Sequence, residues 1–126
     1  MSVRRISTGS PFEAALGYSR AVVAGPWCFV SGVTGYDYAT MTLPEDVAAQ
    51  AAACCDTIER VLAEAGFAMA DVVRVQYTIV SRDDVERIAP VLARVFGEVG
   101  PAATMVVAGL IRPEMKIEVE VTALKA

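Results

Sequence analysis

The sequence predicts an α+β domain in which a mixed sheet carries two helices on one face. Three observations support this prediction: two amphipathic helical segments, several short segments with β-type alternation around them, and a length of 126 residues that suits one domain. The elements follow one another in the order β-β-β-α-β-α-β-β. No linker, repeat or low-complexity stretch divides the chain. Residues 1–126 are therefore expected to form a single domain.

The first third of the chain is expected to be mostly extended. Runs of β-branched and aromatic residues alternate there with Gly, Pro and Ser, which favour turns. The predicted elements are a strand at Val3–Ser7, a turn at residues 8–11, a hairpin of Tyr18–Ala24 and Trp27–Ser31, and a loop at Gly32–Met41.

Two segments have helical periodicity. The first begins at a predicted capping box, Thr42-Leu43-Pro44-Glu45, and ends at Gly66. Its apolar side chains repeat every three or four residues: Val47, Ala51, Cys54, Cys55, Ile58, Val61, Leu62 and Ala65. The second helix runs from about Asp83 to Phe96, and Pro90 inside it predicts a kink.

Three further segments are predicted to be strands: Val72–Val80, Ala102–Ala108 and Lys116–Ala123. The last alternates strictly, with Ile117, Val119, Val121 and Ala123 on one face and Lys116, Glu118, Glu120 and Thr122 on the other. Because two helices cover only one face, Glu118 and Glu120 are expected on the open face, beside Ala103, Met105 and Val107. A carboxylate packed only by apolar groups is costly, so we expect self-association that leaves clefts around Glu118.

Composition narrows the choice of partners. The chain has a net charge of −4 and no basic block, so no nucleic acid partner is expected. The N-terminus lacks the apolar segment of a secretory signal, and residues 21–36 are too short an uncharged run for a span of about 20 residues. A cytoplasmic protein with no membrane partner is expected.

Catalysis by a histidine is excluded, because the sequence contains none. That absence removes Ser-His-Asp and Cys-His mechanisms and leaves few ligands for zinc, so no metal site is expected. The three cysteines, Cys28, Cys54 and Cys55, lie in apolar surroundings and are expected to be buried free thiols.

Short motifs along the whole chain resemble the Rid (YjgF-like, reactive-intermediate deaminase) family. They are Gly17-Tyr18-Ser19, Phe29-Val30-Ser31-Gly32, Asp46-Val47-Ala48-Ala49-Gln50-Ala51, Ala65-Gly66 with Asp71-Val72-Val73-Arg74, and Pro101-Ala102 with Ile117-Glu118-Val119-Glu120. The resemblance implies a chorismate-mutase-like fold and homotrimers with three clefts between subunits. Deaminase members hydrolyse enamines and imines such as 2-aminoacrylate without a cofactor. Some members carry endoribonuclease labels, which nothing in these residues supports.

The resemblance also assigns site residues. A glutamate that positions the attacking water corresponds to Glu118, which is the expected catalytic residue. A cleft tyrosine corresponds to Tyr18, and a Ser-Gly turn corresponds to Ser31-Gly32. Further candidates for substrate binding are Val33, Thr34, Tyr36, Ala103, Met105 and Glu120.

Three positions depart from the family pattern. The signature arginine, which binds the substrate carboxylate through a bidentate pair, would fall at Ala103. Ala89 stands near the position of a cleft asparagine, and Met105 where relatives have a small polar residue or cysteine. Loss of the guanidinium removes the carboxylate anchor, so we expect little or no 2-aminoacrylate deaminase activity. Arg20 and Arg112 are alternative sources of a cation.

Several interpretations stay open. Glu118 is either a solvated residue on an edge strand or a cleft residue. If Glu118 and Glu120 are close together and partly buried, one of the two carboxyls would have a raised pKa. Tyr36 and Tyr38 either shield a helix end or form a lid, and Trp27 is expected to pack within the hairpin. For function, the first hypothesis is an enzyme that acts on an imine, enamine or related reactive carbonyl compound. The alternatives are a non-catalytic metabolite sensor or carrier and a chaperone-like interaction protein.

Overall fold

The computed structural model describes residues 2–126. Its elements are β1 (Val3–Ile6), α1 (Pro11–Leu16), β2 (Ala21–Ala24), β3 (Trp27–Val33), α2 (Val47–Ala65), η1 (Met69–Asp71), β4 (Val72–Ile79), η2 (Arg82–Asp84), α3 (Val85–Phe96), β5 (Ala102–Val107) and β6 (Ile117–Leu124). The strands form one six-stranded sheet in the order β1-β2-β3-β6-β4-β5. Strands β4 and β5 pair in parallel, and the other neighbours are antiparallel.

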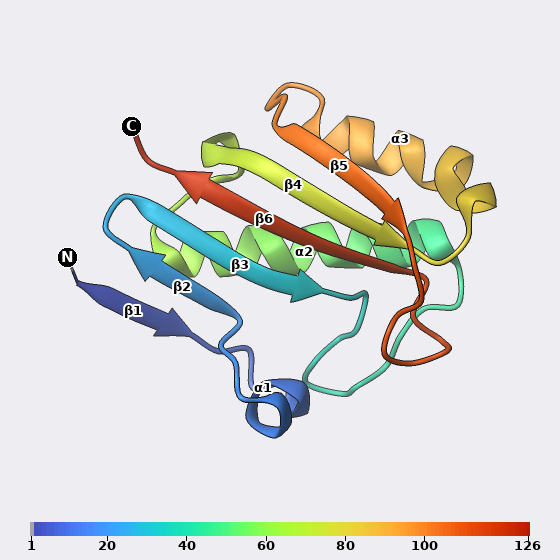
Figure 1. Cartoon of the computed structure of the whole chain (residues 1–126), viewed down its shortest axis with the longest axis horizontal. Helices are drawn as coiled ribbons and strands as arrows, with labels where there is room; N and C mark the ends of the chain where they lie inside the picture. Colours follow the sequence, from blue (N-terminus) through green and yellow to red (C-terminus); the bar gives the residue numbers. More distant parts are fainter. Residues whose placement is uncertain (1) are drawn as a thin grey trace.

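Helix α2 crosses behind the sheet when the uncovered face is viewed from the front, and α3 lies along the β5 edge (Figure 1). The core fills the space between the helices and the sheet. It includes Ile58 and Leu62 of α2 and Val75 and Val119 of the central strands, all fully buried. The predicted mixed sheet with two helices on one face is confirmed. Strand β6 alternates in burial along its whole length, because successive side chains point to opposite faces.

The start of α2 differs from the prediction. The residue that caps the helix is Asp46, whose side chain accepts a hydrogen bond from the Ala49 N–H at 2.9 Å. The predicted capping box at residues 42–45 is therefore wrong, and the helix begins at Val47. An aspartate directly before an apolar run is as good a cap as a threonine, so the sequence offers two competing starts. The predicted end at Gly66 is confirmed.

A short helix, α1, was not predicted. Ser10 caps it by accepting a hydrogen bond from the Phe12 N–H, Pro11 occupies its first turn, and Gly17 ends it with φ 75°. It spans only six residues, too few for a helical period to be recognised in the sequence. Consequently β2 begins at Ala21 and not at Tyr18. Helix α3, in contrast, runs through Pro90 without interruption.

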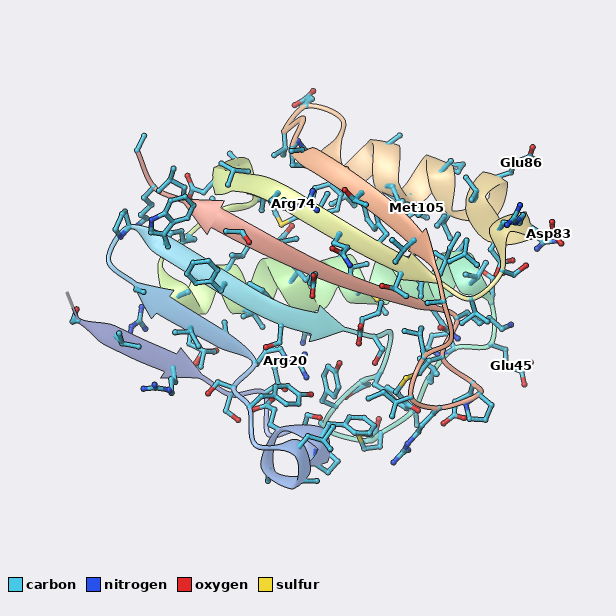
Figure 2. All side chains as sticks on the ribbon, in the orientation of Figure 1. Arg20, Glu45, Arg74, Asp83, Glu86 and Met105 are labelled. Atoms are coloured by element: carbon cyan, nitrogen blue, oxygen red, sulfur yellow. The ribbon has the colours of Figure 1, made fainter. Side chains whose placement is uncertain are left out.

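The uncovered face has a different composition from the one expected. In the parallel register Val75, Tyr77 and Ile79 of β4 pair with Ala103, Met105 and Val107 of β5, and these β4 side chains are in the core. In-register residues point to the same face, so these three β5 residues face the helix side, and the prediction that they share a face with Glu118 and Glu120 is wrong. Figure 2 marks Met105 on β5, at the sheet edge.

Strand β3 carries an irregularity opposite Glu120. Val30 pairs with Val121 and Val33 with Val119, so β3 has one residue more than β6 over this stretch. The extra residue lies at Ser31-Gly32, a β-bulge that continues the strand to Val33 where a loop was predicted. Bulges re-aim side chains and are frequent beside active sites.

The three cysteines are free and buried, as predicted. Burial raises the pKa of each thiol, that of Cys55 to about 12. Within residues 2–126, no helix has the length and apolar composition needed to cross a membrane.

Candidate functional site

A solvent-open cleft of about 340 Å³ lies at the end of the sheet where β3, β6 and α1 meet. It is lined by Leu16, Tyr18, Ser31, Gly32, Ile111, Glu118 and Glu120. The structure thus brings together five of the residues singled out from the sequence: Tyr18, Ser31, Gly32, Glu118 and Glu120.

Gly32 makes room for the Glu118 carboxylate. A Cβ atom built on Gly32 would lie 2.5 Å from the Glu118 Cδ atom and 2.8 Å from each carboxylate oxygen. No side chain fits there without moving Glu118, so the bulge and the carboxylate are adapted to each other. The Ser31 hydroxyl, which donates to the Ser19 carbonyl at 2.6 Å, holds the bulge against the preceding segment.

The Glu118 carboxyl has a raised pKa. Burial is the main cause, the negative charge of Glu120 adds to it, and the positive charge of Arg20 opposes both. The side chain is half-buried, so the carboxyl is partly desolvated yet still reachable from the cleft. A carboxyl in this setting can exchange a proton with a ligand closer to neutral pH than an ordinary glutamate.

This raised pKa predicts a dependence of stability on pH. The folded state binds the Glu118 proton more tightly than the unfolded chain, whose pKa is near 4.5. The resulting stabilisation is complete below that value and is lost as the pH rises through the folded-state pKa. Glu118→Gln removes this loss. In urea denaturation, the variant should therefore gain free energy of unfolding relative to the wild type as the pH increases. A difference that stays constant or shrinks would contradict the assignment.

Arg20 lies directly behind the cleft and is fully buried. Its Nη1 donates to the Gly32 carbonyl at 2.7 Å, its Nε lies 3.7 Å from the Glu13 carboxylate, and its guanidinium stacks 4.8 Å from the Tyr38 ring centre. Figure 2 shows it beside the segment that enters β2, close to α1. Its Nε has no hydrogen-bond partner, but the side chain is fully buried, so it does not clamp a ligand. It fixes the bulge and places a positive charge beneath Glu118.

Glu13 and Tyr18 complete the network around this guanidinium. Burial alone would raise the Glu13 pKa, but hydrogen bonds from the Thr8 N–H and hydroxyl, at 3.1 and 2.6 Å, help lower it below the ordinary value. Glu13 is therefore an ionised, buried partner for Arg20. The Tyr18 hydroxyl accepts a long hydrogen bond from Arg20, 3.4 Å, and its own hydrogen remains free to be donated.

Three candidates lie behind the cleft lining. The Val33 side chain is fully buried in the core. Thr34 and Tyr36 are also buried, and the Tyr36 hydroxyl donates to the Glu114 carboxylate at 2.8 Å. The Thr34 N–H donates to the Tyr38 hydroxyl at 3.2 Å. The burial of Tyr36 argues against a lid, the second of the two interpretations given for the Tyr36–Tyr38 pair.

Two candidates lie on the other face. Ala103 and Met105 are on the helix side of β5, whereas Glu118 is on the uncovered side of β6, with β4 between the two strands. One chain cannot bring them into a single cleft. Arg112, the other proposed cation, is exposed and stacks 4.7 Å from the Phe12 ring centre. Trp27 stacks on Phe29 of the same hairpin, with ring centres 6.1 Å apart, as expected, and is more than a third exposed.

Leu16 and Ile111 were missed in the sequence. They are 60% and 67% exposed, the two highest values among the large exposed hydrophobic side chains of residues 2–126. Leu16 precedes the Gly-Tyr-Ser motif on the unpredicted helix α1, and Ile111 lies in the connection before β6. The position of Leu16 directly before a candidate motif could have indicated that it lines the site. No sequence pattern pointed to Ile111.

Among the described residues, no three His, Cys, Asp or Glu side chains cluster in a way that would hold a metal ion.

Comparisons with known proteins agree on one family. The family model described as endoribonuclease L-PSP matches residues 8–125. An uncharacterised protein of Streptomyces coelicolor is 30% identical over 125 residues, which is 98% of this chain and 93% of that protein.

Solved structures give the same result. Rv2704 from Mycobacterium tuberculosis, a member of the YjgF/YER057c/UK114 family, is 37% identical with a TM-score of 0.89, covering 98% of this chain and 100% of that one. RidA from a Psychrobacter species is 29% identical with a TM-score of 0.86, covering 97% of this chain and 99% of that one. The expected chorismate-mutase-like fold is confirmed. The chain therefore belongs to the YjgF/YER057c/UK114 family, which includes the Rid and L-PSP proteins.

Proposed function

We propose that this protein is a cofactor-independent hydrolase of a small imine or enamine that lacks a carboxylate. The observation that carries the proposal is the Glu118 carboxylate, seated against Gly32 in the β3 bulge and half-buried at the edge of an open cleft. Membership of a family that includes RidA supports the reaction class. The proposal that the substrate lacks a carboxylate rests on the negative charges of the cleft.

The proposed reaction adds water across a C=N bond. Glu118 takes a proton from the water as the water oxygen attacks the imine carbon, and the nitrogen gains a proton from the hydroxyl of Tyr18, which also lines the cleft. Glu118 then returns its proton to the departing nitrogen. As the C–N bond breaks and the C=O bond forms, the hydroxyl of the adduct gives its proton back to the Tyr18 oxygen. One water thus converts the imine into a carbonyl compound and an amine, and both residues regain their starting protonation.

The charges of the cleft argue against anionic substrates. Glu118 and Glu120 both line it, and Arg20 is buried behind the Gly32 carbonyl. A carboxylate such as that of 2-aminoacrylate, or a phosphate of RNA, would meet like charges without a cation opposite. We therefore expect neither 2-aminoacrylate deamination nor RNA cleavage.

We further propose that the active form is a homotrimer. The uncovered sheet face exposes Trp27, Phe29 and Val106, apolar side chains that a second copy would cover. Because Ala103 and Met105 lie on the opposite face from Glu118, they can border its cleft only if they come from a neighbouring subunit. Sedimentation should then give three times the 13.3 kDa of one chain.

The test measures hydrolysis of a panel of uncharged and carboxylated imines by the wild type, Glu118→Gln and Glu59→Gln. Glu59 is exposed on α2 and serves as a charge-matched control. We expect kcat/KM for the best imine to fall by about 100-fold or more in Glu118→Gln and to stay unchanged in Glu59→Gln. Saturable binding of an imine without turnover would favour the sensor or carrier instead. Rapid turnover of 2-aminoacrylate would contradict the proposal.

A further inference from the structure

The cleft carries two negative charges without a partner. Within residues 2–126, neither Glu118 nor Glu120 forms an ion pair, and no side chain donates a hydrogen bond to either carboxylate. A half-buried carboxylate without donors is costly, because burial removes water and nothing replaces it. The Glu118 carboxylate therefore has hydrogen-bonding capacity left for a ligand.

Arg20 offsets part of this charge from beneath the cleft, but none of the nearby cations pairs with either carboxylate. Arg20 is 0% exposed and is committed to Glu13 and the Gly32 carbonyl. Arg74, which Figure 2 marks on β4, lines an adjoining hollow together with Glu120, but its Nη2 donates to Thr104 at 3.1 Å. Arg112 stacks on Phe12.

The walls of the cleft are apolar beside these charges. Leu16 and Ile111 both line it and are the two most exposed large hydrophobic side chains of the described residues. Exposed apolar groups that border a cleft are typical of a surface that covers a ligand. A ligand that suits this cleft has an apolar portion and a group that can donate hydrogen bonds to the carboxylates.

We propose that the ligand of this cleft is a small cation, a protonated imine or amine with at least one N–H and an apolar substituent. This inference rests on the proposed function for placing the ligand beside Glu118. The charged nitrogen lies against Glu118 and Glu120, and the substituent packs on Leu16 and Ile111. An N–H⁺ group supplies both the positive charge and the hydrogen-bond donor that the carboxylates lack.

A cationic substrate also suits hydrolysis. The nitrogen of an iminium already carries the proton that makes its carbon electrophilic, so no acid has to deliver one before water attacks. One water and one iminium give one carbonyl compound and one ammonium ion, and the single positive charge is retained. Glu118 transiently holds the proton that passes from the water to the departing nitrogen.

The experiment compares three ligands of similar shape that do not react: benzylamine, benzyl alcohol and benzoate. Calorimetry near neutral pH measures their affinity for the wild type, Glu120→Gln and the control Glu59→Gln. We expect benzylammonium to bind at least about tenfold more tightly than the alcohol, which corresponds to about 1.4 kcal/mol, and benzoate to bind most weakly. The preference should fall in Glu120→Gln, persist in Glu59→Gln and weaken in about 0.5 M NaCl.

Equal affinity for the amine and the alcohol, tighter binding of benzoate, or no binding of the amine at millimolar concentration would overturn the inference. Because these ligands are not hydrolysed, the outcome is independent of turnover. If the protein hydrolyses a neutral imine but does not bind the amine in preference to the alcohol, the inference that the ligand is a cation is wrong and the proposed function stands. If the protein binds the amine in preference to the alcohol but hydrolyses no imine, the ligand is a cation and the proposed hydrolase function is wrong.

Discussion

Replacing Arg20 with methionine is expected to lower the free energy of unfolding by about 3–5 kcal/mol. The guanidinium is fully buried between Glu13, the Gly32 carbonyl and the Tyr38 ring. Methionine fills part of the volume but leaves the Glu13 carboxylate, 6% exposed, as a buried charge with no cation beside it and only the hydrogen bonds from Thr8. Urea denaturation at fixed protein concentration measures the loss, since the stability of an oligomer depends on concentration.

Two controls separate the charge from general damage. Arg87→Met removes an arginine that pairs with Asp84 at 2.7 Å but is 64% exposed, and should cost no more than about 1 kcal/mol. The double variant Glu13→Gln/Arg20→Met removes both charges and should be more stable than Arg20→Met alone. Similar losses in Arg20→Met and Arg87→Met would contradict the role of the buried pair.

The second large effect is expected at Gly32. Alanine there places a methyl group where the Glu118 carboxylate now lies. The displaced atoms are the end of a flexible side chain, and Gly32 does not have a positive φ, so the fold should persist while the carboxylate moves. A displacement of about 1 Å at a reacting group can reduce the rate by about 100-fold, and we expect that loss in imine hydrolysis.

A double-mutant cycle tests this mechanism. If Gly32→Ala acts by moving the carboxylate, it should change the rate little in a Glu118→Gln background. Gly109→Ala is the matched control, because a Cβ on Gly109 would meet nothing within 4 Å. Additive effects of the two substitutions would show that Gly32 matters for another reason.

Long periodic elements were predictable from the sequence. Helix α2 repeats its apolar residues over nineteen positions and β6 alternates over eight, so each pattern identifies both the element and its buried face. Helix α1 was missed because six residues do not complete two turns. The face of β5 was assigned wrongly because small apolar residues at neighbouring positions give no alternation, and only the register with β4 decides it.

Most residues of the candidate site could be predicted from the sequence, but their arrangement in space could not. The motifs identified Tyr18, Ser31-Gly32 and Glu118, which the structure brings into one cleft. The bulge could not be predicted, because it is defined by the pairing of β3 with β6. The sequence offered Arg20 as a substitute cation, but its burial depends on Glu13, which lies on the unpredicted helix.

Because all three thiols are buried, their chemical modification would show that the core had opened. Cys28 and Cys54 are completely enclosed and Cys55 is 3% exposed, and a thiol must ionise in contact with water before it reacts with an electrophile. Alkylation or oxidation of these sulfur atoms therefore requires the packing between α2 and the sheet to separate. Once one sulfur has been modified, its added bulk cannot return to so close-packed an interior. A transient opening in an oxidising medium would thus become a permanent one.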